Sequence, residues 1–156
     1  MKINKIAFLT LVISFGLIVS CGGNGNKTVI EKPDTPIVEE PEEEVDPMDN
    51  VGIGPVDGLL LADLNDELAL KGKEVFDMKC SACHKTTKRF IGPNVTGVME
   101  RRNPAWVMNM ILNPEEMVEK DPIARQLLME YSAPMANQNL SKEEARSVVE
   151  YFRTLK

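Results

Sequence analysis

The chain of 156 residues contains a single histidine, His84, and only three cysteines. This scarcity limits the metal sites that the chain can form, because a closed structural zinc site takes four ligands. Cys80, Cys83 and His84 would fill only three of those positions. The residues around them also lack the alternation of β-branched residues that predicts strands, which disfavours a thioredoxin-like arrangement. A zinc site and a thiol redox site are therefore the weaker interpretations of these three residues.

The same three residues form one short motif, because residues 80–84 read Cys-Ser-Ala-Cys-His. Two thiols three positions apart, followed directly by a histidine, are the attachment signature of a c-type haem. Each thiol can add to one vinyl group of the porphyrin, and the imidazole can bind the iron from one side. The motif predicts one covalent haem c held by Cys80, Cys83 and His84.

The first 20 residues predict a signal peptide. Lys2 and Lys5 precede an apolar stretch of fourteen residues, 6–19. As a helix this stretch would span roughly 21 Å, which is short of the ~30 Å hydrocarbon core of a bilayer. Residues 18–21 resemble a bacterial lipobox, which implies cleavage before Cys21, lipidation of its thiol and anchoring to a membrane outside the cytoplasm. An uncleaved signal anchor is the alternative.

Residues 21–58 predict an acidic, disordered tether. They carry ten Asp or Glu against two Lys or Arg, and few large apolar residues. Such a composition cannot bury a hydrophobic core. A flexible coil of this length would reach roughly 30 to 35 Å, and its prolines and charge repulsion would extend it further. The acidic run over residues 39–44 is interpreted as a solvated spacer.

Residues 59–156 predict one small all-α domain wrapped around the haem, whose core would be marginal without a cofactor. A first helix, capped by Asp63 or Asn65, is expected to end at the haem motif. A capping box at Ser141 and Glu144 predicts a last helix that runs to the C-terminus. Asn-Pro and Asp-Pro pairs predict three further helix starts. The expected segments are a helix over 106–112, a short turn near 115–117 and a helix over 123–131.

A locally basic segment surrounds the haem motif. Residues 71–102 contain eight Lys or Arg and only three acidic residues. This segment could steer the domain towards an acidic surface on a redox partner. A solvated charged face without a binding role is the alternative.

The second axial ligand of the iron cannot be another histidine of this chain. Met135 is the candidate, because it lies in a non-helical loop before the last helix, where Pro134 stiffens the backbone. Methionines inside predicted helices are more often core residues; these are Met108, Met110 and Met129. The alternatives to Met135 are an iron without a second protein ligand, or Met99, Met117 or Met129.

These residues together resemble the class I c-type cytochromes. The resemblance rests on Lys-Gly-Lys-Glu-Val-Phe at residues 71–76 and Ile-Gly-Pro-Asn at residues 91–94. It rests as well on the loop around Met135 and on the Leu-Ser pair that opens the last helix. It spans residues 64–156 and implies a small helical fold around one haem, with His and Met as axial ligands.

The resemblance also assigns roles to residues outside the motif. The backbone carbonyl of Pro93 would accept the proton on the far nitrogen of His84, which fixes the orientation and basicity of the ring. Gly72 and Phe76 would lie where the first and last helices cross, packed against Tyr151 or Phe152.

Trp106, the only tryptophan, is expected at the porphyrin edge or in the core. Its indole N–H would bond either a haem propionate or a backbone carbonyl. Arg101 and Arg102 would pair with propionates or remain solvated.

The expected function is electron transfer, and the expected protein is a carrier rather than an enzyme. An iron with both axial positions filled can change oxidation state without binding a substrate, and methionine ligation raises its potential. We expect a monomer without a nucleic-acid partner, lipid-anchored to a bacterial membrane and facing the periplasm. Its tether would let the domain visit an upstream quinol-oxidising complex and a downstream terminal oxidase or periplasmic reductase, such as nitrous-oxide reductase, by raising their effective concentration. The alternatives are a haem sensor or enzyme with a weak or absent sixth ligand, and a lipoprotein that handles copper or thiols.

Overall fold

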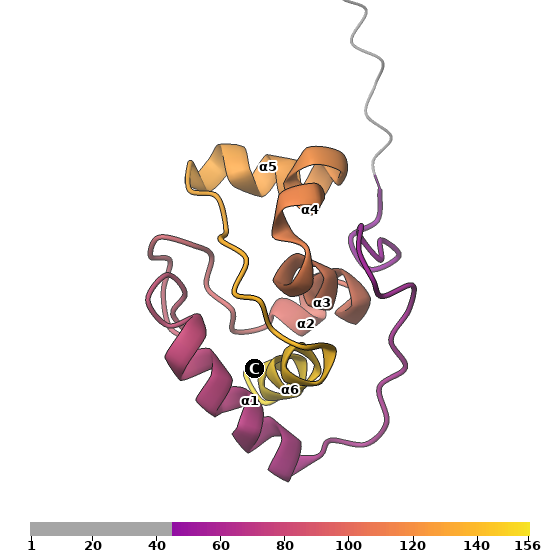
Figure 1. Ribbon diagram of the computed structural model, residues 1–156, viewed down its shortest axis with the longest axis vertical. Helices are drawn as coiled ribbons and strands as arrows, with labels where there is room; N and C mark the ends of the chain where they lie inside the picture. Colours follow the sequence, from indigo (N-terminus) through magenta and orange to yellow (C-terminus); the bar gives the residue numbers. More distant parts are fainter. Residues whose placement is uncertain (1–44) are drawn as a thin grey trace, which may run out of the picture. The chain divides into compact units, whose positions relative to one another are not determined.

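Six helices and their connecting loops make up residues 45–156, the part of the chain that the computed structural model describes (Figure 1). The helices are α1 (Asp66–Lys79), α2 (Val98–Arg101), α3 (Pro104–Leu112), α4 (Pro114–Lys120), α5 (Pro122–Tyr131) and α6 (Lys142–Arg153). No strand occurs among these residues, so the all-α prediction is confirmed. None of the helices described is both long and apolar enough to span a membrane. The predicted signal peptide, Cys21 and residues 21–44 of the predicted tether lie outside the described residues.

Short sequence signals set the ends of the helices. The side chain of Asn65 accepts a hydrogen bond from the N–H of Leu68 at the start of α1. The predicted capping box at Ser141 and Glu144 is present at the start of α6. Proline occupies the first turn of α3, α4 and α5, as the Asn-Pro and Asp-Pro pairs predict.

Two segments differ from the expectation, one in its secondary structure and one in where its helix ends. The segment expected to form a short turn near residues 115–117 is the seven-residue helix α4. Acidic residues in its first turn, Lys120 in its last turn and the complete burial of Met117 favour the longer helix. The last helix ends at Arg153, where Thr154 is the C-cap, and therefore stops short of the C-terminus.

The crossing of α1 and α6 is the main helix contact of the domain. Gly72 is buried there, and a Cβ built on it would lie 1.8 Å from the carbonyl oxygen of Ser147. The ring of Phe76 lies 5.5 Å from that of Tyr151 and 5.8 Å from that of Phe152. The packing expected for Gly72 and Phe76 is therefore confirmed, and both aromatic residues of α6 take part.

A buried carboxylate joins the start of α1 to α6. Glu150 has no exposed side-chain surface, and it accepts a hydrogen bond from the N–H of Asn65 at 2.8 Å. Arg146 and Arg153 also donate to it. Burial alone would raise the pKa of Glu150, but these hydrogen bonds outweigh burial and hold the pKa below its ordinary value.

Residues 46–57, called the strap below, lie against α3 and α4. The side-chain amide of Asn109 donates to the carbonyl oxygens of Val51 and Val56, and its oxygen accepts from the N–H of Val56. These residues were expected to belong to the tether of residues 21–58, but they bond to α3 and α4, so the folded domain begins before residue 58. The strap is held by hydrogen bonds between its backbone and the buried side chain of Asn109. A count of apolar residues cannot detect such bonds, because they do not depend on apolar side chains.

Candidate haem site

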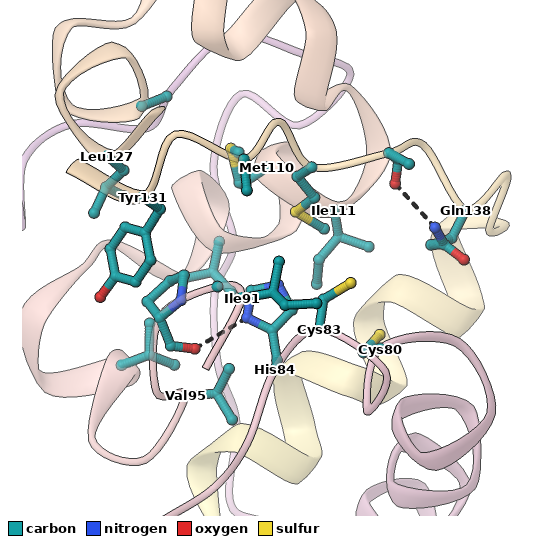
Figure 2. Close-up of a pocket in the computed structure, with 18 of the residues that line it drawn as sticks. Cys80, Cys83, His84, Ile91, Val95, Met110, Ile111, Leu127, Tyr131 and Gln138 are labelled. Carbon is teal, nitrogen blue, oxygen red and sulfur yellow. Dashed lines mark hydrogen bonds between the residues drawn. The ribbon is translucent and has the colours of Figure 1, made fainter. Parts of the chain in front are cut away.

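An apolar cavity of about 220 Å³ lies among α1, α3, α5 and the loop before α6 (Figure 2). Cys80, Cys83, His84, Pro93 and Met135 all line it, so the structure brings together the residues that the sequence analysis assigned to the haem. The labelled side chains of α3 and α5 in Figure 2 border the same space. The main apolar side chains are Trp106, Val107, Met110, Ile111, Leu127 and Tyr131. A cavity with these walls fits a flat, largely apolar group such as a porphyrin.

The imidazole of His84 is held in one orientation. Its Nδ1 atom lies 3.0 Å from the carbonyl oxygen of Pro93, the dashed contact beside His84 in Figure 2. Because a carbonyl oxygen only accepts, Nδ1 is the donor in this contact, and in the neutral ring this leaves the lone pair of Nε2 free to bind a metal. A Cβ built on Gly92 would lie 2.6 Å from Cε1 of His84, so the chain passes directly against the ring. The structure thus contains the hydrogen bond that the resemblance implies for Pro93.

The two cysteines of the motif are free thiols that follow the end of α1. The N–H groups of Cys83 and His84 both bond to the carbonyl oxygen of Cys80, which makes one further turn and brings the three side chains to the cavity. Burial, with a smaller effect of Cys83, raises the pKa of the Cys80 thiol to about 11. A thiol that stays protonated at neutral pH is a poor nucleophile and metal ligand.

The ligand set for a metal site of another kind is missing from residues 45–156. No group of three or more His, Cys, Asp or Glu side chains in that range could hold a metal ion. Within these residues this disfavours a closed metal site built from such side chains.

Met135 reaches the cavity from the loop between α5 and α6. The loop leaves α5 through Ser132, whose φ is 51°, and Asn137 bonds the carbonyl oxygen of Leu112 at the end of α3. Met110, on α3, also lines the cavity. The alternative ligands of the sequence analysis do not line it; these are Met99, Met117 and Met129. The structure therefore leaves Met135 and Met110 as the methionines placed to reach the iron.

Trp106 is buried at the cavity wall, and its bonding partner is neither of the two expected. Its indole N–H donates to Oδ1 of Asp121 at 3.1 Å, not to a backbone carbonyl. Asp121 caps α5, so its carboxylate is already fixed beside the indole. Arg101 donates to backbone carbonyl oxygens, and the Arg102 guanidinium lies 5.6 Å from the centre of the Trp106 ring.

Arg89 supports the cavity wall through contacts that its sequence position does not predict. Its guanidinium donates to the carboxylate of Glu130 at 2.7 Å and to the carbonyl oxygen of the same residue at 2.9 Å. It also lies 4.0 Å from the centre of the Tyr131 ring. Arg89 thus ties the loop after the haem motif to the end of α5, whose Tyr131 lines the cavity. The pairing joins residues 41 positions apart, and no sequence signal marks it.

Some basic side chains of the segment over residues 71–102 form ion pairs with carboxylates, and others do not. Lys71 and Lys73 form ion pairs along α1 with Glu67 and Asp77. Within the part of the chain that the structure describes, three lysines close to the motif form no ion pair; these are Lys79, Lys85 and Lys88.

The fold and the site define a small helical haem protein, and comparison with known families agrees. The chain belongs to the cytochrome c family, whose model, described as "Cytochrome c", matches residues 69–156. Membership of this family implies covalently bound haem c and electron transfer. The class I c-type cytochrome expected from the sequence is thereby supported. No curated protein matches the chain.

Solved structures of cytochromes c are similar to this chain. The cytochrome c from Rhodothermus marinus is 40% identical, with a TM-score of 0.64, over 65% of this chain and 89% of its own. An engineered form of that protein, bound to a carbene intermediate, has 40% identity and a TM-score of 0.61, with the same two coverages of 65% and 89%. The cytochrome c domain of a Pseudomonas putida protein is 30% identical over 53% of this chain and 85% of its own, with a TM-score of 0.50.

Proposed function

We propose that the chain is a membrane-tethered monohaem c-type cytochrome that passes single electrons between respiratory-chain components. The observation that carries this proposal is the cavity that brings Cys80, Cys83, His84 and Met135 together. When bound there, haem iron would alternate between two oxidation states and so carry one electron at a time.

The residues of the cavity have separate tasks in this proposal. Cys80 and Cys83 would hold the porphyrin by thioether bonds, and Nε2 of His84 and the sulfur of Met135 would bind the iron. The carbonyl oxygen of Pro93 keeps the proton on Nδ1 and orients the ring. The apolar walls exclude water. If His84 and Met135 both bind the iron, no position is left for a substrate, which supports an electron carrier over an enzyme.

The sequence before the domain supports the tethering part of the proposal. Residues 1–20 would be removed as a lipoprotein signal peptide, and Cys21 would carry the lipid, placing the domain in the periplasm. Because the strap belongs to the domain, the free tether would comprise only residues 21–45.

Charge supports the partner part of the proposal. Lys79, Lys85 and Lys88, which form no ion pair, lie close to the haem motif in sequence, and Lys79 also lines the cavity. The Nζ atom of Lys85 donates to the carbonyl oxygen of Ser81. An acidic patch on the partner would be attracted to this region and would accelerate encounter. The partners proposed are a quinol-oxidising complex as donor and a terminal oxidase or a periplasmic reductase, such as one for nitrous oxide, as acceptor. The carrier would act as a monomer.

Purification of the mature protein from cells that can attach haem c tests the proposal directly. The product should be coloured, carry the added mass of one haem, and stain for haem after denaturation; a colourless product would overturn the proposal. Cys83→Ala is the control for attachment, because it removes one thioether. The Cys21→Ala variant tests the anchor and should shift the haem-stained protein from the membrane fraction to the soluble fraction.

A haem enzyme or sensor with an open sixth position is the second candidate. It is favoured by the engineered Rhodothermus marinus cytochrome c, which was solved with a bound carbene intermediate. Carbon monoxide separates the two functions: a ferrous protein that binds it readily has an open or weakly held position, whereas the proposed carrier should bind it slowly.

A further inference from the structure

The strap reaches the back of the cavity wall through one buried carboxylate. The Nδ2 atom of Asn50 donates to Oδ2 of Asp121 at 2.6 Å, and Oδ1 of Asp121 accepts from the indole N–H of Trp106 at 3.1 Å. The same Oδ1 accepts from the N–H of Ala124 at 2.8 Å. Asp121 is 2% exposed and Trp106 is 4% exposed, whereas Asn50 is half-buried, so the path runs from the edge of the protein into its interior. A hydrogen bond to a buried charge is among the stronger ones.

Two further contacts show that the strap is fitted to this place. Gly52 adopts a φ of 75°, and a Cβ on it would lie 2.9 Å from the sulfur of Met117 and 3.1 Å from Cδ1 of Trp106. The N–H of Ile53 points to the same sulfur at 3.0 Å. The glycine therefore allows the strap to run directly against the side of the indole, which itself lines the cavity.

The strap also holds the helix pair that closes one side of the cavity. α4 packs mainly on α3 and on α5, and α5 packs mainly on α4. These two helices supply Val118, Leu127 and Tyr131 to the cavity. Arg89 fastens the far end of α5, and the bonds from the strap to Asp121 and Met117 fasten the near end.

We propose that the strap is a positioning element of the haem site: Asn50, acting through Asp121, holds Trp106 and the α4–α5 pair in place as the cavity wall. This inference rests on the proposed function, because it takes the cavity to be the haem site. A broken Asn50–Asp121 bond would loosen the wall, admit water and external ligands, and let Met135 be displaced more readily. Asn50 is a positioning residue, since it does not line the cavity itself.

An exchange of the two side chains tests this pair while keeping every bond. In Asn50→Asp two carboxylates would face each other, and repulsion would push the strap from the wall. In the double variant Asn50→Asp with Asp121→Asn, the new amide can donate to the new carboxylate. Its oxygen can still accept from Trp106 and Ala124, and the carboxylate at position 50 can still accept from Gly52. Met48→Glu is the matched control, because it adds the same charge to the strap at an exposed side chain.

Two measurements on the haem-loaded protein show whether the cavity wall has loosened. Imidazole binding to the ferric protein, followed by absorption, should be faster by about tenfold in Asn50→Asp, the change that corresponds to ~1.4 kcal/mol. Emission from Trp106, the only tryptophan, should rise as it moves away from the quenching haem. The exchanged double variant should return to within about threefold of wild type in the imidazole rate, a coupling that additive effects would not produce. Met48→Glu should match wild type.

The inference is overturned if Asn50→Asp equals wild type in both measurements, or if the double variant is as fast as Asn50→Asp. If Asn50→Asp does not fold, Asn50→Ala, which only removes the donor, gives a milder test with an expected increase of about threefold; a rate equal to wild type overturns the inference there too. Failure of the proposed function is distinguishable, because wild type would then lack haem stain and Trp106 emission would be unquenched in every variant. That result overturns the inference as well.

Discussion

Replacing Gly72 by alanine perturbs the closest approach of α1 and α6. A Cβ at this position would lie 1.8 Å from the carbonyl oxygen of Ser147 and 2.4 Å from its carbonyl carbon. It would also lie 2.9 Å from the nitrogen of Val148. These are backbone atoms in the middle of a helix and cannot rotate aside. The two helices must therefore separate, and the contacts of Phe76 with α6 must weaken.

Two opposing free energies set the size of this effect. Overpacking in a well-packed core costs about 1 to 3 kcal/mol, and we expect ~3 kcal/mol because backbone must move. Alanine is a better helix former than glycine, which offsets about 1 kcal/mol in the middle of α1. The net loss of about 2 kcal/mol corresponds to a decrease in Tm of about 8 to 16 °C for a domain near this size.

Thermal unfolding of the haem-loaded protein, followed by circular dichroism, measures this loss. Gly58→Ala is the matched control, because no atom lies within 4 Å of a Cβ at Gly58, and its Tm should stay close to that of wild type. A Tm for Gly72→Ala equal to or above that of wild type would refute the reasoning, since the helices could not then be in contact through Gly72.

Three further predictions concern the ligand, the buried carboxylate and the partner. Met135→Ala should abolish the methionine-to-iron charge-transfer absorption and keep the haem attached, whereas Met129→Ala, at a position 71% exposed, should keep the absorption; an unchanged Met135→Ala spectrum would move the assignment to Met110. The lowered pKa of Glu150 contributes stability above its ordinary value of 4.5 that is lost as pH falls through the lower folded-state value. Urea unfolding should therefore show a steeper loss of stability below pH 4.5 in wild type than in Glu150→Gln, and equal slopes would contradict this. Electron-transfer rates with an acidic partner should fall as salt rises, because the unpaired lysines are screened; rates independent of salt would dismiss the charged encounter.

Local signals explain how much of the fold could be predicted. The capping box at Ser141 and the Asn-Pro and Asp-Pro pairs at the starts of α3, α4 and α5 act over a few residues, so they are readable in order along the chain. The haem motif is local too. Met135 could be singled out because it lies in a loop, and the structure places it at the cavity.

The contacts that could not be predicted join residues far apart in sequence. Asn50 and Asp121 are 71 positions apart, and Arg89 and Glu130 are 41 apart. A polar side chain that will bond a distant backbone or carboxylate has no periodicity to mark it, and a segment held this way resembles a solvated loop in composition. Trp106 shows the same limit, since two plausible partners were weighed and a third, Asp121, takes its N–H.

The three hydrogen bonds between Asn109 and the strap decide where the protein can be shortened for solution work. A version starting at residue 59, where the composition changes, would leave a carboxamide of 0% exposure without its partners at Val51 and Val56. Each of these hydrogen bonds contributes roughly 0.5 to 1.5 kcal/mol net, so losing all three removes a large share of the stability of a small domain. A soluble version that starts at residue 45 retains all three bonds and is the sounder choice for crystals and spectroscopy.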